Sequence, residues 1–285
     1  MTSLEHHQVA YAQAVASKRR RAWLGLLALT VCILISGQVA EISFSKLFQN
    51  IGSFTGYFVR IFHLENGQLV FTDFGEWFWG WKKWLVLMGE TLLMAYVGTL
   101  LGAVAALVLC FFASKNITSN TVVVVASRRF LEFSRTVPEM VFALIFVVAF
   151  SLGPLPGVLA LAIHTGGALG KLFAEVVENI DLKPVDGIVA SGGTWLQKVR
   201  FGVLPQVASN FASYALLRFE INVRGAAVLG FVGAGGIGQT LLEVIRKFYY
   251  SDISALLVMI VVTVMLIDAI TERVRYRLLG EEAKQ

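Results

Sequence analysis

The chain is poor in charged residues and in cysteine. Only 15% of its 285 residues are charged, whereas an average soluble domain carries about 25%. Hydrophobic residues make up 56% of the sequence, and the mean hydropathy is +0.71. This composition indicates a membrane protein, and its apolar segments leave no stretch of the roughly 100–150 residues that a separate soluble catalytic or nucleotide-binding domain needs.

The two cysteines, Cys32 and Cys110, both lie within apolar segments. They exclude a disulfide framework and a cysteine-based metal site, so we expect them to be packing residues. The net charge of +5 would suggest nucleic-acid binding in a soluble protein. Here the basic residues lie mainly between apolar segments, where they orient a chain in the bilayer. We therefore expect membrane lipid, and no nucleic acid, around this chain.

Long apolar segments predict an all-α polytopic membrane protein, because a helix needs about 20 apolar residues to cross the hydrocarbon core. Six transmembrane helices are predicted, at residues 22–40, 84–113, 137–152, 157–177, 207–232 and 253–270. Charged residues at helical spacing in residues 122–136 predict an amphipathic helix that leads into the third span and lies partly at the interface.

The distribution of Lys and Arg predicts that both termini are cytoplasmic, because most of these residues then flank the spans on the inner side. The predicted parts are an inner tail (1–21), the first span with an extracytoplasmic interfacial segment (22–83), a helical membrane core (84–277) and a second inner tail (278–285). Tryptophans clustered between Trp77 and Trp84 predict a belt at headgroup level.

Two glycine-rich stretches have the appearance of phosphate-binding motifs. Residues 233–238 (GAGGIG) match a dinucleotide fingerprint but follow a membrane helix instead of a strand, so we expect a tight turn at the outer end of the fifth span. Residues 166–172 (GGALGKL) resemble a P-loop, but Thr165 and Leu172 replace two of its defining residues. The spacing of Gly166 and Gly170 predicts close helix packing.

Catalytic constellations are lacking, so no enzyme, cofactor or metal site is predicted. His164 stands alone in the fourth span, without a second metal ligand at helical spacing. We expect it to form a hydrogen bond between helices.

Residues 184–205 connect the fourth and fifth predicted spans. Apolar residues at near-helical spacing on either side of Gly192 and Gly193 predict two short amphipathic helices that meet at a glycine break, and Pro205 is expected to end the element. On periodicity alone, an ordinary cytoplasmic loop would explain this segment equally well.

The same segment resembles the signature of permease subunits of bacterial ABC importers, roughly E-A-A-x-x-x-G-A … L-P. Asp186 falls on the acidic position, Gly192 on the glycine, and Leu204 with Pro205 on the closing pair, whereas Gly187, Ile188 and Gly193 depart from the pattern. The resemblance implies a type I permease fold with a coupling helix that sits in a groove on a separate ATPase subunit. We call residues 184–205 the coupling loop; its candidate contact residues are Asp186, Ala190, Gly192, Gly193, Leu204 and Pro205.

Further stretches, among them residues 139–148, 157–165 and 218–225, resemble the phosphonate-importer subgroup, and together the likeness covers residues 90–277. It implies transport of a phosphonate, phosphite or hypophosphite across the bacterial inner membrane. The partners it implies are two ATPase subunits, which bind the ATP, an extracytoplasmic solute-binding protein and a second copy of this chain. A secondary transporter or channel driven by an ion gradient is the alternative, although no internal repeat is evident.

Three charged residues in the fifth span, Arg218, Glu220 and Arg224, need a reason to lie at membrane depth. Glu220 and Arg224 are spaced for a pair within the helix. Arg218 is left either to line a translocation path for an anion or to pair with a carboxylate on another span, such as Glu90, Glu175 or Glu178. In the fourth span, Lys171, Glu175 and Glu178 form a stripe that we expect to be a structural ion pair with a solvated end.

Overall fold

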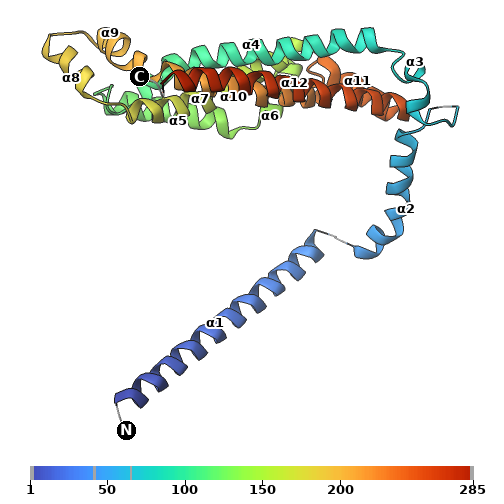
Figure 1. Cartoon of the computed structure of the whole chain (residues 1–285), viewed down its shortest axis with the longest axis horizontal. Coiled ribbons are helices and arrows are strands. Elements are labelled where there is room, and N and C mark those ends of the chain that lie inside the picture. Colours follow the sequence, from blue (N-terminus) through green and yellow to red (C-terminus); the bar gives the residue numbers. More distant parts are fainter. Residues whose placement is uncertain (1–2, 41–42, 65, 283–285) are drawn as a thin grey trace. The chain divides into compact units, whose positions relative to one another are not determined.

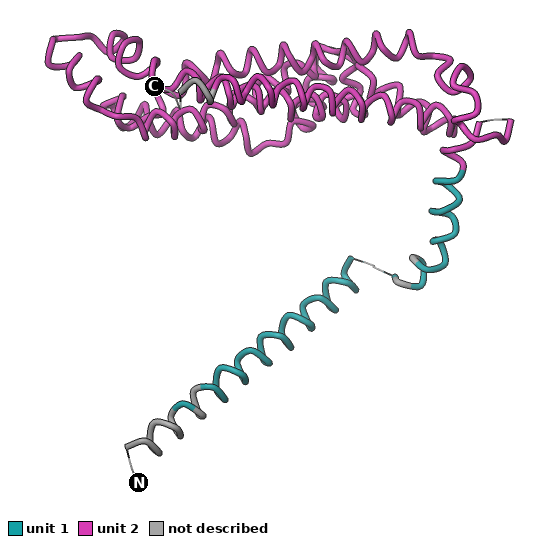
Figure 2. The backbone as a smooth tube through the Cα atoms, in the orientation of Figure 1, with its two compact units in different colours: residues 1–59 teal, residues 60–285 magenta. Residues whose placement is uncertain are grey.

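The computed structural model describes residues 3–40, 43–64 and 66–282 (Figure 1). These residues form helices and connecting turns without any β-strand, apart from an isolated bridge between His63 and Leu69. The chain divides into two compact units, Met1–Val59 and Arg60–Gln285 (Figure 2).

The first unit contains α1 (Ser3–Val39) and most of α2 (Phe44–Ile61). Within α1, residues Val15–Val39 are long and apolar enough to cross a membrane, in agreement with the first predicted span. Exposed apolar residues follow α2 at a spacing of three to four (Phe48, Ile51, Phe54 and Phe58). That spacing gives α2 one apolar face, which is typical of a helix lying at a membrane interface.

The second unit is a bundle of helices with a short helical loop at one end and α3 at the other (Figure 1). Its elements are η1 (Val70–Thr72), α3 (Phe74–Trp77), α4 (Trp81–Ala113), α5 (Thr121–Thr136), α6 (Glu139–Phe150), α7 (Pro154–Glu178), α8 (Lys183–Ala190), α9 (Trp195–Gln197), η2 (Lys198–Val203), α10 (Leu204–Leu229), η3 (Gly230–Val232), α11 (Gly236–Arg246) and α12 (Tyr250–Glu282).

Four described helices are long and apolar enough to cross a membrane, and two bent pairs raise the total to as many as six. The amphipathic helix predicted before the third span is confirmed as α5, but the predicted third span is only partly correct, because α6 covers only Glu139–Phe150 and is bent by 85° from α5. At about 1.5 Å per residue, a helix of that length is too short to span alone. Pro138, which has no N–H to donate, follows the end of α5 and separates the two helices.

Glycines on α7 bring other helices close to its backbone. A Cβ on Gly167 would lie 2.8 Å from the carbonyl oxygen of Leu131, and one on Gly170 would lie 2.5 Å from Cδ2 of the same leucine. Gly166 faces the backbone of Gly102 on α4. The predicted close packing of this face is therefore confirmed, with α5 on one side and α4 on the other.

The tryptophan cluster belongs partly to the protein core. Trp77 and Trp84 are only 4% and 2% exposed, so the prediction of a membrane belt was wrong for these two side chains. Nε1 of Trp77 donates to Oγ of Ser254 over 2.9 Å, which joins α3 to α12. Trp79 and Trp81 remain exposed. The burial of these large aromatic rings and the hydrogen bond of the indole N–H together hold α3 against the N-terminal ends of α4 and α12.

Candidate functional site

The coupling loop folds as two helical pieces on either side of a left-handed glycine, as predicted. α8 ends at Ala190, and Gly192 then adopts φ +78°, a conformation that costs a non-glycine residue about 1–2 kcal/mol. Thr194 caps α9 through a reciprocal arrangement with Gln197. Residues Lys198–Val203 form a π-helical turn, η2, that leads directly into α10.

Pro205 occupies the first turn of α10, so the prediction that it ends the preceding element was wrong. Proline is well suited to this position because the first turn of a helix has no intrahelical partner for its N–H. Leu204 is half-buried at the start of the same helix. The closing Leu-Pro pair thus fixes the point at which the coupling loop joins the bundle.

The coupling loop has an inner and an outer face. Val185, Val199 and Val203 are buried in one apolar cluster with Val177 of α7 and Val207 of α10. On the outer face, the predicted contact residues Asp186 and Ala190 are exposed, and so are the larger apolar side chains of Val189, Leu196 and Phe201. The loop is therefore packed firmly on the bundle while presenting an exposed, partly apolar surface.

Gln206 closes the base of the coupling loop. Its Oε1 accepts from the backbone N–H of Asp181 over 3.2 Å, while its Nε2 donates to the Asp181 carbonyl over 3.1 Å and to the Gly202 carbonyl over 2.6 Å. One side chain on α10 therefore holds both the start of the loop and its last turn. Sequence reasoning missed this residue, because a glutamine after a Leu-Pro pair carries no distinctive signal.

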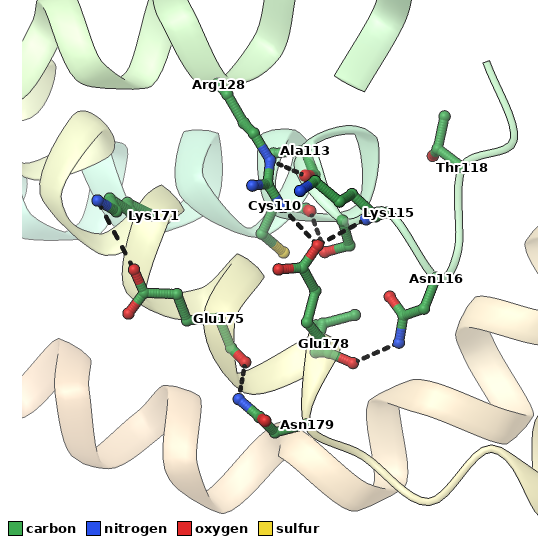
Figure 3. Close-up of polar contacts among 12 residues, drawn as sticks. Cys110, Ala113, Lys115, Asn116, Thr118, Arg128, Lys171, Glu175, Glu178 and Asn179 are labelled. Atoms are coloured by element: carbon green, nitrogen blue, oxygen red, sulfur yellow. Dashed lines mark hydrogen bonds and ion pairs between the residues drawn. The ribbon is translucent and has the colours of Figure 1, made fainter. Parts of the chain in front are cut away.

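A second polar cluster ties α4, α5 and α7 together at the loop end of the bundle (Figure 3). Arg128 of α5 donates through Nε to the Ala113 carbonyl over 2.8 Å and pairs through Nη2 with Glu178 of α7. Glu178 also accepts from the backbone N–H of Lys115 over 2.8 Å. The carbonyl of Ala113, the last residue of α4, and the N–H of Lys115 just after this helix are thereby satisfied by charged side chains from two other helices.

The predicted stripe on α7 is only partly correct. Lys171 and Glu175 form the expected pair, with 3.7 Å between Nζ and Oε1, and both side chains are exposed. Glu178 pairs with Arg128 instead and serves as a joint between helices. In the sequence Arg128 contributes only to the topology signal and to the amphipathic pattern of residues 122–136, since the packing of α5 against α7 is not visible there.

Arg218 lies in a small polar cluster that joins α10, α7 and α6. Its Nη2 contacts Nδ1 of His164, and its Nε lies 3.5 Å from Oγ1 of Thr165. The carboxylate Oε2 of Glu139 lies 3.9 Å from the Arg218 Nη2 and 3.3 Å from the His164 Nδ1. Arg218 thus has a carboxylate partner on another helix, although it is none of the three that we expected. His164 forms the predicted contact between helices.

Glu220 and Arg224 point to a different neighbour. Arg224 Nη2 lies 2.7 Å from Oε1 of Glu220, which confirms the predicted pair within the helix, and 3.5 Å from Oδ1 of Asp268 on α12. Oγ1 of Thr271 on α12 lies 3.4 Å from the other carboxylate oxygen of Glu220. The structure therefore does not bring the three charges of the fifth span together: Arg218 faces α6 and α7, whereas Glu220 and Arg224 face α12.

Asn222, one turn after Arg218 on α10, joins α4, α7 and α10. It is fully buried and donates through Nδ2 to the hydroxyls of Thr99 and Thr165, each over 2.8 Å. Thr165 is therefore shared by Asn222 and Arg218. Because the hydroxyl of Thr165 on α7 bonds Asn222 and contacts Arg218, both on α10, this network holds α7 and α10 together beside the Arg218 guanidinium.

The GAGGIG stretch forms the predicted turn between α10 and α11. Gly233, Gly235 and Gly236 all have positive φ, and a Cβ on Gly238 would overlap the carbonyl oxygen of Ala227. The N–H of Gly153 donates to the Gly233 carbonyl over 3.1 Å, so this turn also anchors the turn after α6. Within the described residues, no group of three or more metal-ligating side chains comes together.

Comparison with known proteins identifies relatives over most of the chain. Residues 98–279 match the family described as binding-protein-dependent transport system inner membrane component. The chain is 31% identical to the putative phosphite transport system permease protein HtxC of Stutzerimonas stutzeri over 97% of this chain and 94% of the relative. It is 41% identical to the phosphite transport system permease protein PtxC of the same organism, over 67% of this chain and 70% of the relative.

A shorter relative is the putative cryptic phosphonate transport system permease protein PhnE2 of Escherichia coli K12, which is 54% identical over 41% of this chain and 96% of its own length. Among solved structures, the inward-facing MetNI methionine ABC transporter matches with a TM-score of 0.60 and 22% identity, over 68% of this chain and 95% of that one. A bacterial ABC transporter involved in the import of the acidic polysaccharide alginate matches with a TM-score of 0.61 and 13% identity, over 90% of this chain and 96% of that one. At these identities the structural likeness shows the fold alone.

Proposed function

The chain belongs to the family of binding-protein-dependent transport system inner membrane components, which are ABC importer permeases, and from this membership we propose that it carries phosphite or a phosphonate. The observation that carries the choice of substrate is the likeness to HtxC, named for phosphite transport, over 97% of the chain. PtxC and PhnE2 support the same class of phosphorus oxyanion.

As an ABC importer permease, the chain is a multi-pass inner-membrane protein and not an enzyme, and it works with an ATPase and a substrate-binding protein. This membership favours ATP-driven import over an ion-gradient-driven transporter. We place two ATPase subunits, which bind the ATP, against two copies of this chain. The end of the bundle that carries the coupling loop then faces the cytoplasm together with both termini, in accord with the distribution of basic residues.

The outer face of the coupling loop is the surface that we assign to the ATPase. Asp186, Ala190 and Gly192 are exposed there beside apolar side chains, while Gly193 supports the turn and Leu204 with Pro205 fixes the loop to α10. Because the inner face is packed into the bundle, a displacement of this loop by the ATPase is transmitted to α7 and α10. ATP-driven movement of the loop would thereby bias the two access states of the path.

The translocation path is assigned to the polar faces of α10. Arg218 offers a guanidinium, whose planar N–H donors match an oxyanion. Arg224 is half-exposed at membrane depth, with 50% of its side chain accessible, and contact with lipid there would be unfavourable. We therefore assign Arg224 and its partner Glu220 to a polar wall of the path as well.

The test of this assignment is substitution of Arg218 in the complete system of permease, ATPase and binding protein. Because hydrogen bonds to a charged group contribute about 1.5–3 kcal/mol, Arg218→Gln is expected to lower phosphite uptake about tenfold or more. Lys171→Gln removes a positive charge from an exposed pair on α7 and is the matched control. Unchanged uptake by a correctly assembled Arg218→Gln permease would contradict a role for Arg218 in the path.

A further inference from the structure

The positive charge of Arg218 is already neutralised in this conformation. Glu139 Oε2 lies 3.9 Å from the Arg218 Nη2, within ion-pair range but beyond direct hydrogen-bond distance. Both side chains are partly accessible, at 14% for Arg218 and 25% for Glu139. An anion that binds Arg218 therefore has to compete with a carboxylate of the protein itself.

The absence of a side chain at Gly225 leaves space for the carboxylate of Glu139. A Cβ on Gly225 would lie 2.7 Å from the Glu139 Oε1. Glu139 also lies in the first turn of α6, next to the unpaired N–H groups and positive end of that helix. A carboxylate at this position keeps a favourable electrostatic partner when it loses Arg218.

Nδ1 of His164 lies close to both Arg218 and Glu139, but it can form a hydrogen bond with only one of them at a time. This nitrogen contacts Arg218 and lies 3.3 Å from the Glu139 Oε2. A ring nitrogen either accepts a hydrogen bond or, when it carries a proton, donates one. Nδ1 can therefore accept from Arg218 or donate to Glu139, but it cannot do both at once. Glu139 and Arg218 are thus coupled through a shared neighbour with two hydrogen-bonding arrangements.

We propose that Glu139 is an exchangeable counterion for Arg218, which the transported oxyanion displaces when it binds. This inference rests on the proposed transport of a phosphorus oxyanion. In the unloaded state Glu139 neutralises the guanidinium, so the path carries no uncompensated cation at membrane depth. When an oxyanion arrives, it binds the guanidinium in place of Glu139. Glu139 then keeps its favourable interactions with the N-terminus of α6 and with the His164 ring. The exchange lets a cationic site release its anion, because the carboxylate returns to compete for Arg218.

The test measures binding of phosphite to the permease–ATPase complex in nanodiscs without the binding protein, by broadening of the phosphite ³¹P resonance. Removing the competing charge with Glu139→Gln is expected to tighten phosphite binding about tenfold, equivalent to about 1.4 kcal/mol. The double variant Glu139→Gln, Arg218→Gln is expected to abolish that gain. Glu139→Asp retains the acid in the first turn of α6 but retracts it from Arg218, so it should tighten binding even if the amide variant fails to assemble.

Two results would overturn the exchange: phosphite affinity that is unchanged or weaker in both Glu139 variants, or a gain in affinity that persists without Arg218. Glu175→Gln, which removes a carboxylate from an exposed pair on α7, is the matched control and should leave affinity unchanged. ATP-driven uptake by the complete wild-type system is measured alongside. Absence of phosphite or phosphonate uptake there contradicts the proposed function, whereas normal uptake with unaltered affinity in the Glu139 variants contradicts only the exchange.

Discussion

The side-chain amide of Gln206 bonds both backbone groups of Asp181, with Oε1 accepting from the N–H over 3.2 Å and Nε2 donating to the carbonyl over 3.1 Å. Asp181 precedes the coupling loop and Gln206 follows it, so this pair closes the loop at its base. We expect a loop closed in this way to follow α7 and α10 when they move. Together with the buried inner face of the loop, the pair would then pass force from an ATPase to the bundle.

Gln206→Ala is expected to weaken this coupling while leaving the bundle folded. Each of the lost hydrogen bonds contributes about 0.5–1.5 kcal/mol, which is enough to loosen the loop base without unfolding the core. Phosphite uptake per ATP hydrolysed in proteoliposomes should fall several-fold. Asn210→Ala, one turn further along α10, is the matched control. Equal phosphite uptake per ATP hydrolysed in the two variants would show that the pair of Gln206 and Asp181 has no role in coupling.

Gly192→Ala should destabilise the coupling loop, because its φ of +78° is unfavourable for a residue with a Cβ. The expected cost is about 1–2 kcal/mol, to be measured as a loss of thermal stability in detergent together with reduced uptake. Gly187 lies in helical backbone with open space around its Cβ position. Gly187→Ala should therefore be neutral or raise stability by about 0.5–1 kcal/mol. The account of the turn would be wrong if the two alanines behaved alike.

Gly238→Ala is expected to disrupt the turn between α10 and α11. The added methyl group would overlap the carbonyl oxygen of Ala227. Because this oxygen belongs to the backbone, it cannot move aside as the end of a flexible side chain could. We predict a loss of about 3 kcal/mol or more, seen as poor yield of the assembled permease. Gly89 on α4 has nothing within 4 Å of its Cβ position, so Gly89→Ala should assemble normally. Normal assembly of both variants would refute the close approach.

Glu178→Gln tests the joint between α4, α5 and α7. It removes the charge that pairs with Arg128 and accepts from the Lys115 N–H, and hydrogen bonds to charged groups contribute about 1.5–3 kcal/mol. Thermal unfolding in detergent should show a clear loss of stability. Glu175→Gln breaks only an exposed pair within α7, for which a change of about 0.5 kcal/mol or less is expected. A larger loss in Glu175→Gln than in Glu178→Gln would contradict the joint.

The local features of the fold were predictable because they depend on neighbouring residues. Apolar length located the helices α4, α7 and α12, and the glycine at position 192 located the break in the coupling loop. The pair of Glu220 and Arg224 followed from helical spacing alone. Each of these predictions required only the geometry of one element.

Partners on different helices could not be predicted. Glu139 was visible as an acid at the start of an apolar segment, but only the packing of α6 against α7 and α10 places it beside Arg218. The same is true of Arg128 with Glu178, and of Gln206 with Asp181. The bend of 85° between α5 and α6 was not predicted, because Val137 and Pro138 mark a break between two helices in the sequence but do not fix the angle between them.

The most direct test of the whole account is uptake of labelled phosphite into proteoliposomes, with the binding protein outside and ATP inside. Uptake is expected only when the permease is assembled with its ATPase, and it should be lost when the exposed face of the coupling loop is altered by Asp186→Lys and Ala190→Lys. Phosphite uptake by this chain alone, driven by an ion gradient and indifferent to those substitutions, would contradict this expectation.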